Sequence, residues 1–137
     1  MKLPARELLA YVSSFCLAVW QDIWDCCEGN KLHSIYPTVG ILKHSKNMSG
    51  YDSVLLNRLR IGHSRLTQSY LLCGDDPLTC QSCGLPLTVK HTLVECCNLH
   101  DIREKYFTVS SVTDLFKSID KHTIINFIKA TDFYHQL

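Results

Sequence analysis

The sequence predicts a mainly α-helical fold in a single domain, and three observations lead to that prediction. Apolar residues between Leu8 and Cys27 recur every three or four positions, which is the spacing of one face of a helix. Helix-capping residues and glycines divide much of the remaining chain into shorter helical segments. The length of 137 residues and the apolar share of 46% allow one modest hydrophobic core.

Residues 1–30 are expected to form an N-terminal amphipathic helix. This helix should stop at Gly29-Asn30, where Gly29 can take a left-handed conformation. Trp20 and Trp24 lie four residues apart and share a face, where they fill either the core or a groove of a partner protein. Charged residues bracket or interrupt the apolar stretch, so it predicts no membrane span, and it lacks the cleavage site of a signal peptide.

Residues 31–50 are expected to form an extended connector. Pro37, Gly40 and Gly50 lie among polar residues, a composition typical of loops. One short strand is expected around Leu32 to Ile35.

Residues 51–107 are expected to hold a basic helix followed by a cysteine-rich knuckle. The apolar pattern from Tyr51 to Cys73 predicts a helix that is interrupted at Gly62 and resumes after Ser64. The Cys-Gly-Asp-Asp-Pro run at residues 73–77 then ends the helix.

The segment CQSCGLPLTVKHTLVECC, residues 80–97, carries the most specific chemistry of the sequence. Cys80, Cys83, His91 and Cys96 have the spacing C-x2-C-x7-H-x4-C. Three thiolates and one imidazole are a complete tetrahedral set for Zn²⁺, and a closed set of four ligands indicates a structural ion. Gly84 lets the backbone curl so that amides face the first two sulfurs. The predicted fold is therefore a small helical domain built around one CCHC zinc knuckle with a short turn or hairpin.

The second half of this motif presents a geometric difficulty. Thr88 is a suitable N-cap that places His91 in the first turn of a helix. On a regular helix, however, His91 and Cys96 lie about 140° apart around the axis. We therefore expect the helix to be distorted, or to break at Cys96-Cys97, before a new start through residues 101–107.

The remaining cysteines leave one question open. Cys97 competes with Cys96 for the fourth ligand position, and the sequence alone does not choose between them. In the absence of a signal peptide, we expect a reducing compartment and therefore free thiols rather than disulfides. The cysteines outside the motif are predicted to be small buried hydrophobic residues. They are Cys16, Cys26, Cys27 and Cys73.

Residues 108–137 are expected to form two short C-terminal helices. Ser111 and Asp114 resemble a capping box before the first helix, and Asp120 is a suitable N-cap for the second. The second helix carries apolar residues from Ile124 to Phe133, which are expected to pack against the rest of the domain.

The basic residues gather in the middle of the chain. The net charge of the whole sequence is only +1, but residues 31–66 hold six basic residues and one acid. Such a region is a candidate surface for RNA or DNA, and the alternative is a solvated face that only keeps the protein soluble. The predicted nucleic-acid-binding residues are Arg58, Arg60, His63, Arg65, Lys43 and Lys46.

Residues 58–96, RLRIGHSRLTQSYLLCGDDPLTCQSCGLPLTVKHTLVEC, resemble a known family. They are similar to the C-terminal region, downstream of ribonuclease H, of the Pol protein of jockey-type arthropod non-LTR retrotransposons. The upstream Trp20-Gln21, Trp24 and Asn30-Lys31-Leu32 also look like that family, so the resemblance covers about residues 15–107. The family usually has a proline after the last ligand cysteine, whereas this sequence has Cys97 there, which again leaves the fourth ligand in question.

The resemblance implies a role beside a polymerase and a ribonuclease H, whose own segments are not found in this sequence. Ribonuclease H needs several carboxylates that converge on two magnesium ions, and no such set occurs here. We therefore expect a non-catalytic, intracellular accessory module, cytoplasmic or nuclear, that binds nucleic acid. One alternative is a scaffold that docks on the polymerase and ribonuclease H body. The other is a fragment of a ribonuclease H or reverse transcriptase protein that lacks the catalytic residues.

Overall fold

The computed structural model describes residues 4–40 and 47–137. The chain divides into two compact units, Met1–Ser45 and Lys46–Leu137. The division falls within residues 31–50, the segment that the sequence marks as a connector. Residues 41–46, which include the predicted nucleic-acid contacts Lys43 and Lys46, lie outside the described residues.

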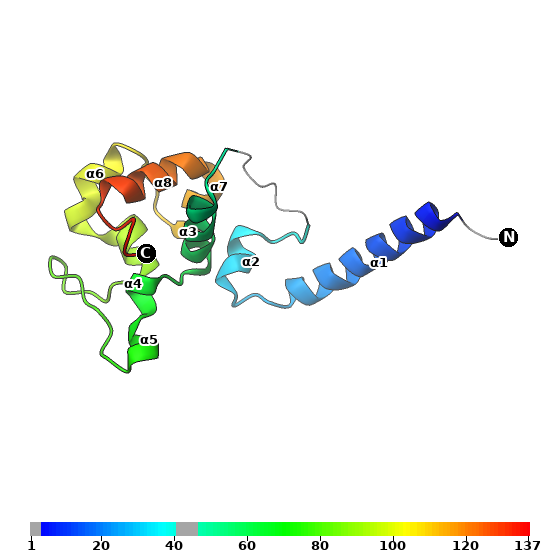
Figure 1. Ribbon diagram of the computed structural model, residues 1–137, viewed down its shortest axis with the longest axis horizontal. Coiled ribbons are helices and arrows are strands. Elements are labelled where there is room, and N and C mark those ends of the chain that lie inside the picture. The colour runs from blue at the N-terminus through cyan, green and yellow to red at the C-terminus, as the bar shows by residue number, and fades with distance from the viewer. Residues whose placement is uncertain (1–3, 41–46) are drawn as a thin grey trace. The chain divides into compact units, whose positions relative to one another are not determined.

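The first unit begins with α1, Ala5–Asp25, which is one continuous helix in Figure 1. The predicted N-terminal helix is therefore confirmed, but it ends at Asp25, before the expected stop at Gly29. The amide of the C-cap residue Cys26 already donates to the Trp24 carbonyl, which closes the helix early. Gly29 does not take a left-handed conformation, so the predicted glycine cap was wrong.

The second helix of this unit, α2, Lys31–Ile35, occupies the place of the predicted strand. Asn30 is its N-cap, and the Asn30 side chain accepts a hydrogen bond of 2.8 Å from the Leu32 amide. This cap starts a helix where the apolar residues alone suggested an extended segment, so the strand prediction was wrong.

Two side chains of α1 bind the backbone that follows α2. The Trp24 indole Nε1 donates to the Tyr36 carbonyl at 2.8 Å. Gln21 donates from Nε2 to the Pro37 carbonyl at 2.8 Å, and its Oε1 accepts from the Val39 amide at 2.8 Å. Trp24 is thus a half-buried structural residue of this unit, in line with the alternative that it packs inside the protein.

In the described parts of the chain, no helix is long and apolar enough to cross a membrane.

The second unit starts with three helices, α3 at Gly50–Ile61, α4 at Arg65–Gln68 and α5 at Tyr70–Cys73. The predicted interruption is confirmed, because Gly62 has a left-handed φ of +79° and ends α3. Ser64 then begins α4 through a capping box with Thr67, in which the side chain of each bonds to the backbone amide of the other.

The rest of the second unit is also helical. A π-helix at His91–Glu95 and a 3-10 turn at Cys97–Leu99 lead into α6, His100–Glu104. The two predicted C-terminal helices are α7, Val112–Ser118, and α8, Lys121–Ala130, and their caps are Ser111 and Asp120 as predicted. Apart from one isolated bridge between Thr79 and Pro86, the described residues contain no β-structure. The mainly helical fold class is confirmed.

The core of the second unit lies around α8. This helix contacts α3 and α6, and Figure 1 shows it between them. Phe127 is fully buried and packs edge-on against Tyr106 and Phe107, with ring centroids 6.1 and 5.1 Å away. The helical segment of the knuckle joins the same core. Its contributions are Val89, Leu93, Cys96 and Leu99.

A polar contact at the edge of this core fastens the residues after α8 to α3. The Tyr134 hydroxyl donates to an Asp52 carboxylate oxygen at 2.6 Å, and the Lys129 ammonium lies 3.5 Å from the other oxygen. The Tyr134 hydrogen bond is the largest cause that lowers the pKa of Asp52 below its ordinary 3.8, and the same contact raises the pKa of Tyr134 to about 12. This contribution to stability is present above pH 3.8 and is lost as the pH falls through the lower pKa of the folded state.

Replacing Tyr134 with phenylalanine is expected to lower the free energy of unfolding by about 1 kcal/mol at pH 7, the net value of one hydrogen bond. The deficit should shrink as the pH falls below 3.8, since a protonated Asp52 accepts more weakly. Urea titrations at several pH values measure this, and Tyr106→Phe, which keeps an aromatic ring in the core, is the matched control. A deficit that is the same at pH 3 and pH 7 contradicts the assignment.

Candidate metal centre

The first two cysteines of the motif lie on a tight turn. The Gly84 amide donates to the Cys80 carbonyl at 2.8 Å, and the Cys80 amide donates to the Leu85 carbonyl at 2.8 Å. Gly84 has a φ of +66°, a left-handed value that side chains other than glycine rarely adopt. Because Thr79 and Pro86 pair across its base, the segment has the shape of the short turn or hairpin that the sequence predicts.

The turn also prepares Cys80 to be a thiolate. The His91 imidazole has the largest effect and lowers the pKa of the Cys80 thiol, and the amides of Cys83 and Ser82 lower it further. These amides face the sulfur as expected from the curl after Cys83. The His91 imidazole and the turn amides therefore favour the charged form of Cys80, which is the form that binds a metal ion.

The other two ligands come from the helical segment after the turn. Thr88 caps this segment as predicted, because its hydroxyl accepts a hydrogen bond of 3.0 Å from the His91 amide. The Thr92 hydroxyl donates back to the Thr88 carbonyl at 3.1 Å. His91 is thereby fixed in the first turn, with only 1% of its surface exposed.

The helix resolves the His91–Cys96 difficulty by becoming wider. Residues 91–95 form a π-helix, and the Cys96 amide donates to the His91 carbonyl at 2.7 Å, five residues back. A bond between residues i and i+5 places His91 and Cys96 one full turn apart, where a regular helix would separate them around its axis. The helix then ends at Cys96, whose backbone is extended with ψ 121°. The expected distortion is found, and it is an expansion of the turn.

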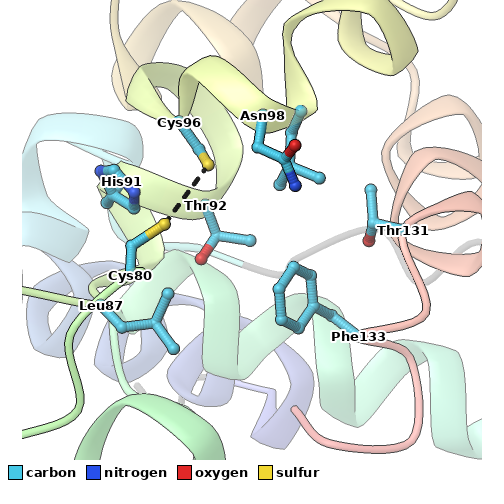
Figure 2. Close-up of a pocket in the computed structure, with 9 residues that line it drawn as sticks. Cys80, Leu87, His91, Thr92, Cys96, Asn98, Thr131 and Phe133 are labelled. Carbon is cyan, nitrogen blue, oxygen red and sulfur yellow. Dashed lines mark hydrogen bonds between the residues drawn. The ribbon is translucent and has the colours of Figure 1, made fainter. Parts of the chain in front are cut away.

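Together, turn and π-helix bring four side chains to one point. One ligand atom each from Cys80, Cys83, His91 and Cys96 lies within 4.8 Å of all the others. The Cys96 sulfur is 3.8 Å from that of Cys80 and 3.9 Å from that of Cys83. Figure 2 shows the His91 ring beside the Cys80 and Cys96 sulfurs. This cluster can hold a metal ion.

The imidazole of His91 gives independent support for a metal ligand. Both of its ring nitrogens are buried, and neither has a hydrogen-bond partner among the described residues. The ring lies near enough to the Cys80 thiol to lower its pKa, but not in the geometry of a hydrogen bond. Burying an unpaired nitrogen is costly, and coordination of an ion by one of the two removes part of that cost.

The surroundings of Cys96 disfavour a thiolate unless a metal ion is bound. Burial raises the pKa of its thiol to about 11, so the group is neutral at pH 7 without an ion. A bound divalent ion reverses this, since a coordinating thiol is deprotonated outright. The buried Arg103 donates from Nη2 to the Cys96 carbonyl at 3.0 Å, which places a positive charge next to the cluster. No pattern in the sequence singles out Arg103.

Cys97 lies outside the four-atom cluster and is exposed. Its sulfur is 3.0 Å from the Cys83 sulfur, and this contact is the largest cause that lowers the pKa of Cys83 to about 7. The structure therefore brings Cys96, and not Cys97, together with Cys80, Cys83 and His91.

The predicted nucleic-acid contacts are only partly on the surface. Arg58, His63 and Arg65 are exposed around the junction of α3 and α4. Arg60 is buried, donates to the Asn57 side chain at 3.0 Å and lies over the Phe116 ring, 5.7 Å from its centroid. The predicted set of nucleic-acid-binding residues thus loses Arg60 to the interior.

The cysteines outside the motif do not have the expected positions. Cys16, Cys26 and Cys73 are exposed and Cys27 is half-buried, so the prediction of small buried hydrophobic residues was wrong. Cys16 lies on α1 and Cys73 ends α5, and neither helix has a buried residue, although the apolar spacing of α1 suggested a buried face.

No protein-family profile, no curated protein and no solved structure matches this chain. The resemblance to jockey-type retrotransposons therefore stays a prediction. The function has to be inferred from the cluster of three thiols and one imidazole and from the surfaces around it.

Proposed function

We propose that the chain is a non-catalytic accessory module, whose second unit is organised by one structural zinc ion and binds nucleic acid. The observation that carries the proposal is the closed cluster of Cys80, Cys83, His91 and Cys96. The cluster offers thiolate and imidazole donors, which together favour zinc over the oxygen-loving ions magnesium and calcium.

The sulfur separations support zinc. A tetrahedral ion with Zn–S bonds of about 2.3 Å holds its sulfurs about 3.8 Å apart. The two separations from Cys96, 3.8 and 3.9 Å, agree with that value. In the same geometry Cys97 is unsuitable as a partner of Cys83, because their sulfurs are only 3.0 Å apart.

A structural role follows from the ligand count and from the energies involved. Four protein ligands complete a tetrahedral shell and leave no position for a reacting water. Structural zinc contributes about 10–16 kcal/mol in zinc-finger peptides, whereas a whole domain is stable by about 5–15 kcal/mol. An ion at this site is therefore able to decide whether the second unit folds.

The first test is the metal itself. We expect one zinc ion per chain by elemental analysis, and loss of helical circular dichroism when a strong chelator removes it. Cys96→Ser should abolish stoichiometric zinc, since it removes a ligand, while Cys73→Ser, an exposed cysteine on α5, should not. Protein that is free of metal yet folded and indifferent to chelator would falsify the proposal.

The proposed nucleic-acid surface is the junction between α3 and α4. Arg58 lies in the last turn of α3, His63 follows Gly62, and Arg65 begins α4. The His63 amide donates to the Arg58 carbonyl at 3.0 Å, so the backbone holds the two residues close together. These exposed side chains can contact successive phosphates of a single strand.

The affinity for single-stranded RNA should fall as the salt concentration rises, with a slope set by the number of cationic side chains that contact phosphates. Two arginines, which contribute about −0.7 each, predict a slope of log K against log salt between about −1 and −2. Arg58→Ala and Arg65→Ala should each make the slope shallower by about 0.7, whereas Lys105→Ala on the exposed end of α6 should not. Fluorescence anisotropy measures this, and a slope near zero speaks against the surface.

A second candidate function is protein docking through α1. Large apolar side chains are exposed over its length, with Tyr11 at 71%, Leu9 at 66% and both Phe15 and Ile23 at 62%. Contiguous exposed apolar surface of this kind marks an interaction site more often than a free face. The partner implied by the resemblance is the polymerase and ribonuclease H body of a parent element.

A docking helix without its partner should associate with itself. We expect light scattering to give a mass above the 15.7 kDa monomer that rises with concentration. Phe15→Glu combined with Trp20→Glu should return the monomer, because charges oppose burial, while Ser14→Glu, on an exposed polar position of α1, is the control. A monomer at every concentration, unchanged by these substitutions, argues against docking through α1.

A further inference from the structure

A fifth sulfur lies directly beside the metal cluster. Cys97 Sγ is 3.0 Å from Cys83 Sγ, closer than Cys96 Sγ is to either Cys80 or Cys83. The thiol of Cys97 is exposed and that of Cys83 is half-buried. Cys97 therefore contacts a ligand of the cluster without belonging to the cluster.

The backbone explains why neighbouring cysteines have such different positions. Cys96 is extended, with φ −61° and ψ 121°, and it stands between the π-helix and the 3-10 turn at Cys97–Leu99. The Cys96 side chain is buried among the ligands, while Cys97 starts the new turn on the exposed side. The amide of Cys97 also faces the Cys83 sulfur, so two groups of one residue hold that contact.

The separation favours one particular disulfide. A disulfide bond is about 2.05 Å long, so Cys83 and Cys97 need to approach by about 1 Å. Pairing Cys96 with Cys80 or Cys83 needs a larger movement of a buried side chain. Of the sulfurs near the cluster, Cys97 is the one that an oxidant in solution reaches most easily.

We propose that Cys97 is an oxidation site that opens the metal centre by forming a disulfide with Cys83, an inference that rests on the proposed zinc site. The oxidant is a hydroperoxide such as hydrogen peroxide. The Cys97 thiol first loses its proton to solvent, and the resulting thiolate attacks one peroxide oxygen. The O–O bond breaks, hydroxide leaves and takes up a proton to form water, and the Cys97 sulfur becomes a sulfenic acid. The Cys83 thiolate then attacks the Cys97 sulfur, the S–O bond breaks, and hydroxide leaves. Two electrons pass from the two sulfurs to the peroxide.

The consequence for the ion is the loss of one anionic ligand. A disulfide sulfur is no longer a thiolate, so only Cys80, His91 and Cys96 remain as ligands. Because the ion then lacks a complete shell, its affinity falls and it is released. Reduction by a dithiol restores both thiols and the four-ligand set.

The test uses the full chain loaded with zinc and treated with a small excess of hydrogen peroxide. A chromogenic chelator follows zinc release, and peptide mapping by mass spectrometry identifies the disulfide. We expect a Cys83–Cys97 disulfide that forms together with zinc release, and reversal of both by dithiothreitol. Cys97→Ser should bind one zinc as wild type does, since Cys97 is not a ligand, but release it about tenfold more slowly under peroxide. Cys73→Ser, which removes an exposed cysteine elsewhere, should behave as wild type.

Two results overturn the inference while leaving the zinc site intact. One is zinc release from Cys97→Ser at the wild-type rate, and the other is a disulfide that joins Cys83 to Cys80 or Cys96. A chain that binds no zinc but still forms the Cys83–Cys97 disulfide overturns the proposed function and leaves the oxidation site standing. Mapping the disulfide thus separates the two failures.

Discussion

The geometry of the candidate metal centre depends on one hydrogen bond, from the Cys96 amide to the His91 carbonyl at 2.7 Å. This bond closes a π turn, and a regular helical turn at the same place would direct one of the two side chains away from the cluster. The residues on either side of the π turn stabilise the wider turn. It starts from the Thr88 cap, which fixes the first turn, and it ends where Cys96 leaves the helix. Expanded turns of this type occur often at functional sites, and here the turn brings two candidate ligands to one side.

The same segment links the cluster to the hydrophobic core, so binding of an ion there would be coupled to folding. Leu93, in the middle of the π-helix, is fully buried, and Leu99 in the following turn is nearly so. Arg103 on α6 holds the Cys96 carbonyl, and α6 in turn contacts α8 at the centre of the unit. A zinc ion with three thiolates carries a net negative charge, and the guanidinium of Arg103 is a nearby group that offsets it. An ion that orders residues 91–96 therefore orders the elements packed against them.

Much of this second unit could be predicted because its signals are local. The ligand spacing, the left-handed Gly62 and the caps at Ser64, Thr88 and Asp120 each depend on a few neighbouring residues. The predictions were wrong where a neighbouring residue had a stronger effect on the backbone than the residues on which the prediction was based. At Gly29 the helix had already ended through the turn at Cys26, and at residues 31–35 the Asn30 cap decided for helix over strand. The burial of Arg60 and Arg103 depends on distant partners, Phe116 and the Cys96 carbonyl, which no sequence pattern announces.

The two units bury their apolar side chains to different extents. In the second unit, helices, cluster and core pack together, although Leu71 and Leu72 on α5 remain exposed. In the first unit, α1 is held at Gln21 and Trp24, but residues such as Leu9 and Phe15 remain exposed. A metal ion bound at residues 80–96 would stabilise the second unit. We therefore propose that the centre serves folding and that α1 offers an apolar surface to a protein partner.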